Sequence, residues 1–342
     1  MSVRLWQAQR GHGREIKQVR AKISKASRLA QNRHAVIFCC DANYLPFAAL
    51  AISTLLDSVS EPDFDICIVS LDALELPEQL AVSKVRMCQI DVDTRFDSLP
   101  TSHRFSVAAY LRIVLAEAFE RDYDRILYMD CDIMVVGERF ASVFDLDLGP
   151  APVGAVMDVF KEKRPNQQTH DQRAINMSGS YFNSGVLLID CQRFLKQQIA
   201  DKCIYAATQY AKEKIYFDQT LLNLVLQGKW AQLHPAWNWQ WEVVRPQFSV
   251  YADPQVVHFL SGQKPWSDQR GTIPIKYREK SRRFFQQYYP ELDKKAAPAA
   301  LWLKKRKVFA RLIKHALLAT RFVDMFNKHG GDIMRVLPAP KD

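Results

Sequence analysis

From His34 onward the chain alternates short apolar runs with helix-like segments, and this alternation limits the folds open to it more than any other feature. The run AVIFCC at 35–40 is followed by the loop DANYLP and then by the helix-like segment FAALAISTLLDSV. Strands that alternate with helices favour a parallel sheet covered by helices. The sequence therefore predicts an α/β protein with a Rossmann-like, mostly parallel mixed sheet flanked by helices.

The same alternation continues through the middle of the chain. Further strand-like runs occupy residues 64–70, 84–92, 125–129, 133–137, 152–158 and 181–190. Helix-like segments occupy residues 110–119 and 191–212, and the pattern closes near residue 290. A chain of 342 residues is within the range of one large domain with extensions. We expect a main domain at 34–290, flanked by extensions at 1–33 and 291–342.

Positive charge is concentrated at the two ends of the chain. Residues 1–34 hold nine Lys and Arg against one acidic residue, and residues 296–342 hold ten against three. The whole chain carries a net charge of +10, so residues 35–295 are mildly acidic, at −5. A mildly acidic core argues against a groove for nucleic acid and makes the partners of the two ends a separate matter.

Both extensions are predicted to be basic helices. In the N-terminal one, Ile16, Val19, Ile23 and Leu29 are spaced among Lys and Arg without a strand pattern. In the C-terminal extension, residues 299–328 form an amphipathic helical pattern that is clearer than the N-terminal one. Their predicted apolar face consists of Trp302, Phe309, Leu312, Ile313, Ala316 and Val323. This face could dock on the core, or it could lie in a membrane interface with Lys and Arg near anionic lipid.

The chain carries no apolar run of the ~18 residues that a bilayer span requires, and its N-terminus lacks the apolar stretch of a secretory signal. Its seven cysteines show no CxxC spacing, which fits reduced, buried thiols. We therefore expect a cytoplasmic protein, peripheral on the inner face of the cell membrane.

The strongest local signal is RILYMDCDIMVVG, in which an apolar strand delivers Asp130 and Asp132 at its carboxyl end. Ligands of parallel α/β sheets gather at that edge. Two carboxylates one residue apart can turn toward one hard cation, and such an ion can bridge the oxygens of a diphosphate. The segment predicts a divalent-metal site that neutralises a leaving diphosphate.

A second signal is HFLSGQKPW, which begins at His258. A neutral imidazole can be the third protein ligand of the metal, and Lys264 can reach a phosphate as a point charge. Gly262 permits close approach of the backbone between them. A lone His beside an apolar run can also be a satisfied core side chain, and it is the following Lys264 that favours a site.

Four segments in this order resemble glycosyltransferase family 8: FCCDANY, YMDCDIMV, YFNSGVLLID and HFLSGQKPW. This family holds the retaining galactosyl- and glucosyltransferases of bacterial lipopolysaccharide and relatives such as glycogenin. The resemblance spans roughly residues 35–270. It implies a GT-A fold, a UDP-sugar donor, a Mn²⁺ or Mg²⁺ ion, and retention of the anomeric configuration.

Carried onto this sequence, the resemblance implies that Asp130, Asp132 and His258 are the metal ligands and that Lys264 contacts the diphosphate. Arg112, in AAYLRI, resembles the basic residue of the family that contacts the donor. Arg112 could instead be an ordinary surface charge on a helix.

The resemblance also implies a uracil and ribose site made by Cys39, Asp41, Asn43 and Tyr44. An Asp at that place can accept hydrogen bonds from the uracil imide or from sugar hydroxyls. Asp41 and Asn43 could instead cap the helix that follows, because both residue types are favoured there.

Three further positions are implied to face the transferred sugar: Asn183 in FNSG, and Asp218 and Gln219 in FDQT. Gln219 matches the side chain beside the reactive carbon, on the face opposite the leaving group. The alternatives are purely structural roles: a turn at Asn183, and a helix N-terminus at Asp218 and Gln219. The residue after Gln219, which is often acidic in the family, is Thr220 here, so we do not expect a covalent intermediate on a carboxylate.

These observations predict a retaining hexosyltransferase that passes galactose or glucose from a UDP-sugar to a saccharide or glycolipid acceptor, such as a lipopolysaccharide core. Glycogenin-like self-glucosylation, or a nucleotide-binding scaffold without turnover, are the alternatives. A haloacid-dehalogenase-type phosphatase also has an Asp-x-Asp after a strand, but it requires Thr or Val where this chain has Met134.

Overall fold

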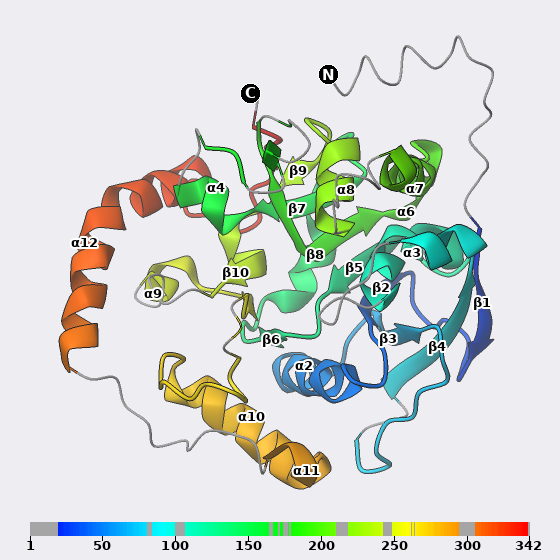
Figure 1. Cartoon of the computed structure of the whole chain (residues 1–342), viewed down its shortest axis with the longest axis horizontal. Helices are drawn as coiled ribbons and strands as arrows, with labels where there is room; N and C mark the ends of the chain where they lie inside the picture. Colours follow the sequence, from blue (N-terminus) through cyan, green and yellow to red (C-terminus); the bar gives the residue numbers. More distant parts are fainter. Residues whose placement is uncertain are drawn as a thin grey trace.

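The computed structural model describes most of the chain and shows a large sheet covered by helices on both faces (Figure 1). The described residues are 20–80, 84–99, 107–163, 167–169, 172–173, 177, 179–209, 218–241, 248–260, 262, 264–293 and 305–340. The main sheet has the strand order β1-β4-β3-β2-β5-β8-β7-β9-β12, and a small second sheet has the order β10-β11-β6.

The parallel centre of the main sheet is formed by the first predicted strands. They are β2 (His34–Cys39), β3 (Asp65–Ser70), β4 (Val85–Val92) and β5 (Arg125–Met129). Their apolar runs are buried on both faces, as strands inside a helix-covered parallel sheet must be. All four carboxyl ends therefore reach the same edge of the sheet.

The other half of the sheet mixes directions. β8 (Phe182–Asp190) runs antiparallel between β5 and β7 (Val153–Met157), and β7 pairs in parallel with β9 (Ala231–Gln232). The predicted mixed sheet is thereby confirmed. The pairing of β7 with β8 shifts register between Ala155 and Val156, so β8 is irregular around residues 183–187.

Helices separate into two groups on the two faces of this sheet. One core contains side chains of α3 (Leu115–Ala118), α6 (Cys191–Lys196), α7 (Ile199–Gln209) and α8 (Asp218–Val225). The core on the opposite face is built on α2 (Leu45–Ser58). Two predicted helices are each broken in two: residues 107–119 form the 3₁₀ helix η3 (Val107–Ile113) and then α3, and Gln198, at φ 53°, separates α6 from α7.

The second sheet holds β6 (Ile133–Val135) against β11 (Val256–His258), with β10 (Trp239–Gln240) on the other side. The described residues also form one longer helix, α10 (Ile275–Tyr288). The short helices among them are η2 (Thr94–Ser98), η4 (Phe140–Asp145), α4 (Val159–Lys163), η6 (Pro235–Asn238), α9 (Ser249–Ala252) and α11 (Pro290–Asp293). The antiparallel register of β11 and β6 sets His258 opposite Ile133, directly after the two aspartates.

The N-terminal prediction of a helix is wrong for Ala21–Ala26, which form strand β1 and pair antiparallel with β4. The alternating sequence AKISKA places Ile23 toward the core, and its backbone covers the edge of β4 that would otherwise be unpaired. β1 therefore belongs to the main sheet. Residues 1–19 of that extension lie outside the described residues.

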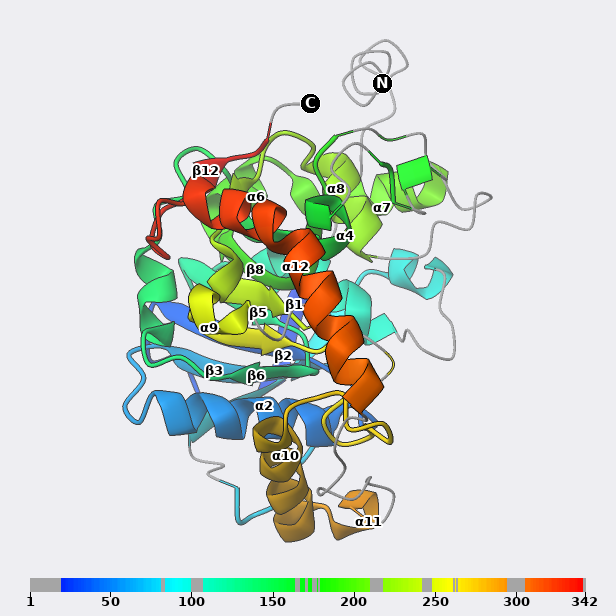
Figure 2. The ribbon, with the colours of Figure 1, turned by 90° about the vertical axis from the view of Figure 1, so that its left-hand side faces the viewer.

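The C-terminal helix is present as α12 (Lys305–Lys328), which crosses one side of the molecule (Figure 2). It docks through Phe322 and Met325, which are buried, and Phe322 stacks on Phe248 with ring centroids 4.2 Å apart. The chain then returns to the main sheet as β12 (Leu337–Pro338), beside β9. Residues 294–304, including Trp302, lie outside the described part.

The face of α12 that the sequence offers for docking is not the face that docks. Phe309 is 66% exposed, Ile313 62%, Leu312 45% and Val323 51%, and the neighbouring Leu317 is also exposed. Of the two alternatives for this face, packing on the core is therefore excluded for these side chains. Among the described helices, none has the length and apolar character needed to cross a bilayer.

Candidate active site

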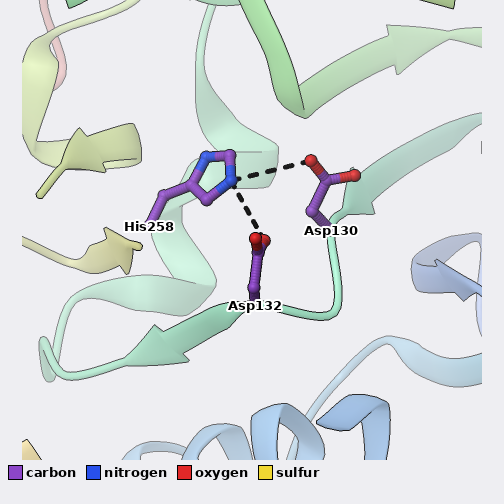
Figure 3. A group of neighbouring side chains, drawn as sticks. All are labelled: Asp130, Asp132 and His258. Carbon is purple, nitrogen blue, oxygen red and sulfur yellow. Dashed lines mark ion pairs between the residues drawn. The ribbon is translucent and has the colours of Figure 1, made fainter. Parts of the chain in front are cut away.

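Three side chains from distant parts of the chain converge at the carboxyl end of β5. Nε2 of His258 lies 3.1 Å from Oδ1 of Asp132 and 3.6 Å from Oδ2 of Asp130. Figure 3 shows the imidazole facing both carboxylates. One ligand atom from each residue lies within 4.8 Å of the other two. This is the arrangement that the sequence predicts for a metal site.

The fold explains why these residues meet. β5 ends at Met129, and the N–H of Asp130 donates to the carbonyl of Gly185 on the neighbouring β8, 2.8 Å away. The chain then turns from the main sheet into β6, and the N–H of Phe259 donates to the carbonyl of Asp132 at 3.1 Å. One aspartate is thus held by the main sheet and the other by the small sheet.

The two carboxylate oxygens of Asp130 have different partners: one binds neighbouring side chains of the protein, and the other faces the proposed metal site. Its Oδ1 accepts a hydrogen bond from the Tyr128 hydroxyl at 2.6 Å and lies 2.9 Å from Nη2 of Arg112. Its Oδ2 faces His258. A carboxylate fixed through one oxygen leaves the second oxygen oriented for a ligand.

Asp132 divides its oxygens in the same way. Its Oδ2 lies 2.6 Å from the ammonium of Lys264, which also donates to the carbonyl of Phe259. Its Oδ1 is buried and accepts no hydrogen bond from the residues that the structure describes, although His258 is beside it. Burial alone would raise the pKa of the Asp132 carboxyl, but His258 and Lys264 outweigh that effect and hold the pKa well below its usual range.

These residues fit a divalent cation. Two carboxylate oxygens and one imidazole nitrogen are ligands that Mn²⁺ accepts, and a buried carboxylate oxygen without a hydrogen bond calls for a positive partner. The backbone of β8 also leaves the necessary room. A Cβ added to Gly185 would lie 2.1 Å from Cε1 of His258 and 2.7 Å from Oδ2 of Asp130, so only glycine allows the cluster to form here.

A hollow of about 140 Å³ opens beside the cluster. Its walls are Cys39, Cys40, Asp41, Tyr44, Ala108, Ala109, Arg112, Tyr128, Asp130, Cys131 and Asp132. Three of the four residues predicted to hold the nucleoside thus line one hollow with both aspartates. The fourth, Asn43, is exposed and does not line it.

Asp41 also serves the local fold. Its Oδ1 accepts hydrogen bonds from the N–H groups of Asn43 and Tyr44, at 3.0 and 3.1 Å, just before α2 begins. The capping alternative is not what the structure shows, because the N-cap position of α2 is Tyr44 and no side chain makes a capping hydrogen bond there. Asp41 instead closes a turn before the helix, and its carboxylate lines the hollow. Tyr44 is 45% exposed at its mouth.

Arg112 is not a surface charge. Its side chain is only 7% exposed and lies between Asp130 and Asp218, with Nε 3.1 Å from the carboxylate of Asp218. Its Nη1 donates to both oxygens of Ser184, and the guanidinium stacks 4.4 Å above the ring of Tyr128. The guanidinium therefore lines the hollow while binding protein groups, which makes it a support for Asp130.

The FNSG segment lies within strand β8, so the alternative of a turn before the strand is wrong. Asp218 begins α8, in agreement with the helix-terminus alternative, and its buried carboxylate accepts from Ser184 Oγ at 3.0 Å. Burial and the nearby Asp130 raise the pKa of Asp218, although Arg112 opposes them. Oε1 of Gln219 accepts from the Ser184 N–H at 3.0 Å, and Asn183 Nδ2 is 3.3 Å from it.

Gly262 differs from the expectation in one respect. A Cβ at this position would meet no protein atom within 4 Å, so no contact within the described residues requires glycine there. Close approach of a donor phosphate stays a prediction.

Sequence reasoning missed three residues of the site: Tyr128, Gly185 and Asn238. Tyr128 had a usable signal, because it lies two residues before Asp130 and so shares its side of β5. Gly185 and Asn238 had none, because their roles depend on a crossing of β8 with the small sheet. Asn238 is fully buried and contacts Nδ1 of His258 at 3.1 Å.

Known proteins resemble this chain in sequence. The chain is 28% identical over 254 residues to General stress protein A of Bacillus subtilis, which covers 68% of this chain and 87% of that protein. It is 26% identical over 306 residues to a lipopolysaccharide 1,2-glucosyltransferase of Escherichia coli, which covers 83% of this chain and 86% of that protein.

The fold resembles that of solved structures. The galactosyltransferase LgtC, in complex with donor and acceptor sugar analogues, superposes with a TM-score of 0.59 at 22% sequence identity, over 77% of this chain and 96% of LgtC. This likeness confirms the expected GT-A fold. The family model for glycosyl transferase family 8 matches residues 35–270. That match, together with the two-sheet fold and the Asp-Asp-His cluster it spans, shows that the chain belongs to glycosyltransferase family 8 and is a transferase.

Proposed function

We propose that this glycosyltransferase moves a hexose, galactose or glucose, from a UDP-sugar to a saccharide acceptor with retention of the anomeric configuration. The observation that carries the proposal is the convergence of Asp130, Asp132, His258 and Lys264 on one point beside the hollow. A nucleoside diphosphate placed in that hollow would direct its phosphates toward the same point.

Asp130, Asp132 and His258 would hold a Mn²⁺ or Mg²⁺ ion through Oδ2, Oδ1 and Nε2. Such an ion, when bound, neutralises the negative charge that develops on the departing diphosphate. The ammonium of Lys264 lies at Oδ2 of Asp132, beside the proposed metal site. Its positive charge would help the ion to neutralise the departing diphosphate.

The remaining residues would orient the donor. Asp41 and Tyr44 lie at the wall where the uracil and ribose are expected, and Cys39 contributes a small buried side chain beneath them. Arg112 orients Asp130 by its contact with Oδ1. These residues bind and position the substrate without a covalent bond to it.

Gln219 and Asp218 would serve the transferred sugar together with Asn183. A direct role for the Gln219 oxygen at the reactive carbon requires Oε1 to release the Ser184 N–H, since that bond is 3.0 Å long in this structure. In the proposed reaction the acceptor hydroxyl attacks from the face of the leaving group, through a state with oxocarbenium character. The leaving phosphate takes the proton of the acceptor.

The acceptor is proposed to be a lipid-linked saccharide such as a lipopolysaccharide core. The lipopolysaccharide 1,2-glucosyltransferase among the relatives supports this class, because the alignment covers 86% of that protein. The exposed face of α12 supports a location on the inner face of the cell membrane. Phe309, Ile313 and Leu317 form its apolar row, and Lys305, Arg306 and Lys314 are exposed on the same helix.

The test is donor hydrolysis. Purified protein is incubated with Mn²⁺ and a panel of UDP-sugars, and released UDP is measured for the wild type and for the double variant Asp130→Ala and Asp132→Ala. Asp124→Ala is the matched control, because Asp124 precedes the same strand at its other end and pairs with the exposed Arg33. We expect metal-dependent release from one sugar, lost in the double variant and kept in the control.

If no UDP is released from any UDP-sugar of the panel, and calorimetry detects no binding of UDP, the proposal is overturned. A gain of hexose mass on the protein itself would instead identify the glycogenin-like, self-glucosylating alternative. Release that persists in the double variant would show that the aspartates do not carry the reaction.

A further inference from the structure

A chain of amide side chains runs from strand β8 to the proposed metal ligand His258. Nδ2 of Asn238 donates to Oδ1 of Asn183 at 2.9 Å, and Oδ1 of Asn238 lies 3.1 Å from Nδ1 of His258. All three residues are buried, and Asn238 is fully so. Buried groups of this kind hold their orientation through the hydrogen bonds that they make.

The donor and acceptor of each hydrogen bond in this row of amide side chains can be derived from backbone N–H groups, because a backbone N–H can only donate. The N–H of Gly185 donates to the Asn183 side chain at 3.1 Å, so the atom that receives it must be the oxygen Oδ1. The N–H of Ser184 fixes Oε1 of Gln219 in the same way, and Asn183 therefore presents Nδ2 to Gln219. Two independent donors agree on one orientation of Asn183.

The orientation of Asn238 follows. An oxygen of Asn183 can only accept, so Asn238 must offer it the amide Nδ2, and Oδ1 of Asn238 then points at the imidazole. Because that oxygen can only accept, Nδ1 of His258 must carry a proton. The second ring nitrogen, Nε2, is left as the atom directed at Asp130 and Asp132.

We infer that Asn238 is a positioning residue that holds His258 in the tautomer able to bind a metal ion through Nε2. This inference rests on the proposed metal site. Hydrogen-bond partners of metal-binding histidines select the ring nitrogen that meets the ion, and their loss typically weakens metal binding 10–100-fold. The amide of Asn238 takes that place here, and its orientation derives from the Gly185 backbone.

The first measurement is the tautomer itself. Metal-free protein with ¹⁵N-labelled histidine is studied by long-range ¹H–¹⁵N correlation spectra at alkaline pH, and His258 is assigned among the eight histidines by its loss in His258→Gln. We expect a protonated Nδ1 in the wild type and a protonated Nε2, or a mixture, in Asn238→Leu. A protonated Nε2 in the wild type would overturn the inference.

The second measurement is the Mn²⁺ affinity, from the electron paramagnetic resonance signal of free Mn²⁺. We expect Asn238→Leu to bind 10–100-fold more weakly. Asn238→Asp keeps an acceptor for Nδ1–H but loses the donor to Asn183, so it should bind Mn²⁺ more tightly than Asn238→Leu does. Asn223→Leu is the matched control, because Asn223 is also a buried amide, bonded to the Phe182 backbone, and should bind as the wild type does.

The outcomes separate this inference from the proposed function. A wild type that binds no Mn²⁺ would reject the metal site, whatever tautomer is found. A wild type that binds Mn²⁺, with Asn238→Leu binding equally well, would reject the role of Asn238 alone. Equal loss in Asn223→Leu and Asn238→Leu would also reject it, because the effect would then follow from any buried amide.

Discussion

Gly185 lies so close beneath His258 that a single methyl group between them would overlap the imidazole ring. Gly185→Ala should therefore push His258 away from Asp130 and weaken Mn²⁺ binding at least tenfold, with loss of UDP release. Calorimetry of Mn²⁺ binding measures the effect.

Gly154→Ala is the steric control for this change. Its added Cβ would lie 2.6 Å from Leu148 in the core, away from the site, so it should lower stability but leave the metal affinity of the folded protein unchanged. Equal affinities in Gly185→Ala and the wild type would show that the cluster can shift to accept a methyl group.

Arg112 should be the residue whose removal costs the site most stability. Arg112→Leu leaves the carboxylates of Asp130 and Asp218 partly buried without their cation, and breaking such a pair costs roughly 3–5 kcal/mol. Urea unfolding at neutral pH measures the loss. Arg33→Leu breaks an exposed pair with Asp124 and should cost about 1 kcal/mol or less, so similar losses would contradict the account.

Glu117 should make the protein less stable as the pH rises. Burial raises the pKa of Glu117 from 4.5 to about 8, and within the described part of the chain its Oε2 has no hydrogen-bond partner. Below pH 4.5 both the folded and the unfolded protein keep the proton. Between pH 4.5 and 8 only the unfolded protein releases it, so stability falls through that window.

Glu117→Gln removes this titration. The variant should gain on the order of 2–4 kcal/mol over the wild type at pH 9 and little at pH 4.5, as measured by urea unfolding. Glu138→Gln, at an exposed position that is not among the charges acting on Glu117, should change neither value. A gain for Glu117→Gln that is the same at both pH values would refute the burial argument.

The C-terminal segment should loosen in acid. His234 and His329 lie with ring centroids 4.9 Å apart, and burial lowers the pKa of both, that of His234 to about 4. The unfolded chain binds protons first as the pH falls below 6.5, so the stability is complete above pH 6.5 and is lost toward pH 4.

Hydrogen exchange of residues 329–340, corrected for intrinsic rates, should therefore accelerate between pH 7 and pH 5. His329→Gln should reduce this acceleration, because one of the two titrating rings is gone. An unchanged pH dependence in His329→Gln would exclude the pair as its source.

The exposed row on α12 should bind lipid. Replacing Phe309, Ile313 and Leu317 together by Asp should weaken binding to vesicles of phosphatidylcholine and phosphatidylglycerol at least tenfold, as measured by co-sedimentation. Added salt should weaken the binding of the wild type, because it screens the Lys and Arg charges. Tyr251→Asp, at another exposed aromatic residue, should bind normally, and equal binding by the triple variant would reject the surface.

Periodicity was enough to predict the sheet, because β2, β3 and β5 are long apolar runs that only a helix-covered parallel sheet can bury. It failed for Ala21–Ala26, because this short, half-exposed edge strand carries two Lys and a Ser among three apolar residues and pairs along the free edge of β4. It left the docking of α12 open, because the side that packs is the one that meets Phe248, a residue of another segment.

The site divides in a similar way. Asp130, Asp132, His258 and Lys264 could be predicted from their types and their place after strands, since ligands gather at that edge. The residues that hold these four side chains in place could not be predicted. Gly185 and Asn238 act through contacts between β8 and the small sheet, and no local pattern records which backbone N–H fixes which amide.

Strand β12 gives the C-terminal end of the chain a protective task. It covers β9, which is otherwise the outermost strand of the main sheet, and the carbonyl of the nearby Ile333 accepts a hydrogen bond from buried Trp237. A bare strand edge invites pairing with another chain. Shortening the protein before residue 333 would therefore uncover the edge of β9, and a truncated transferase would be recovered as aggregates.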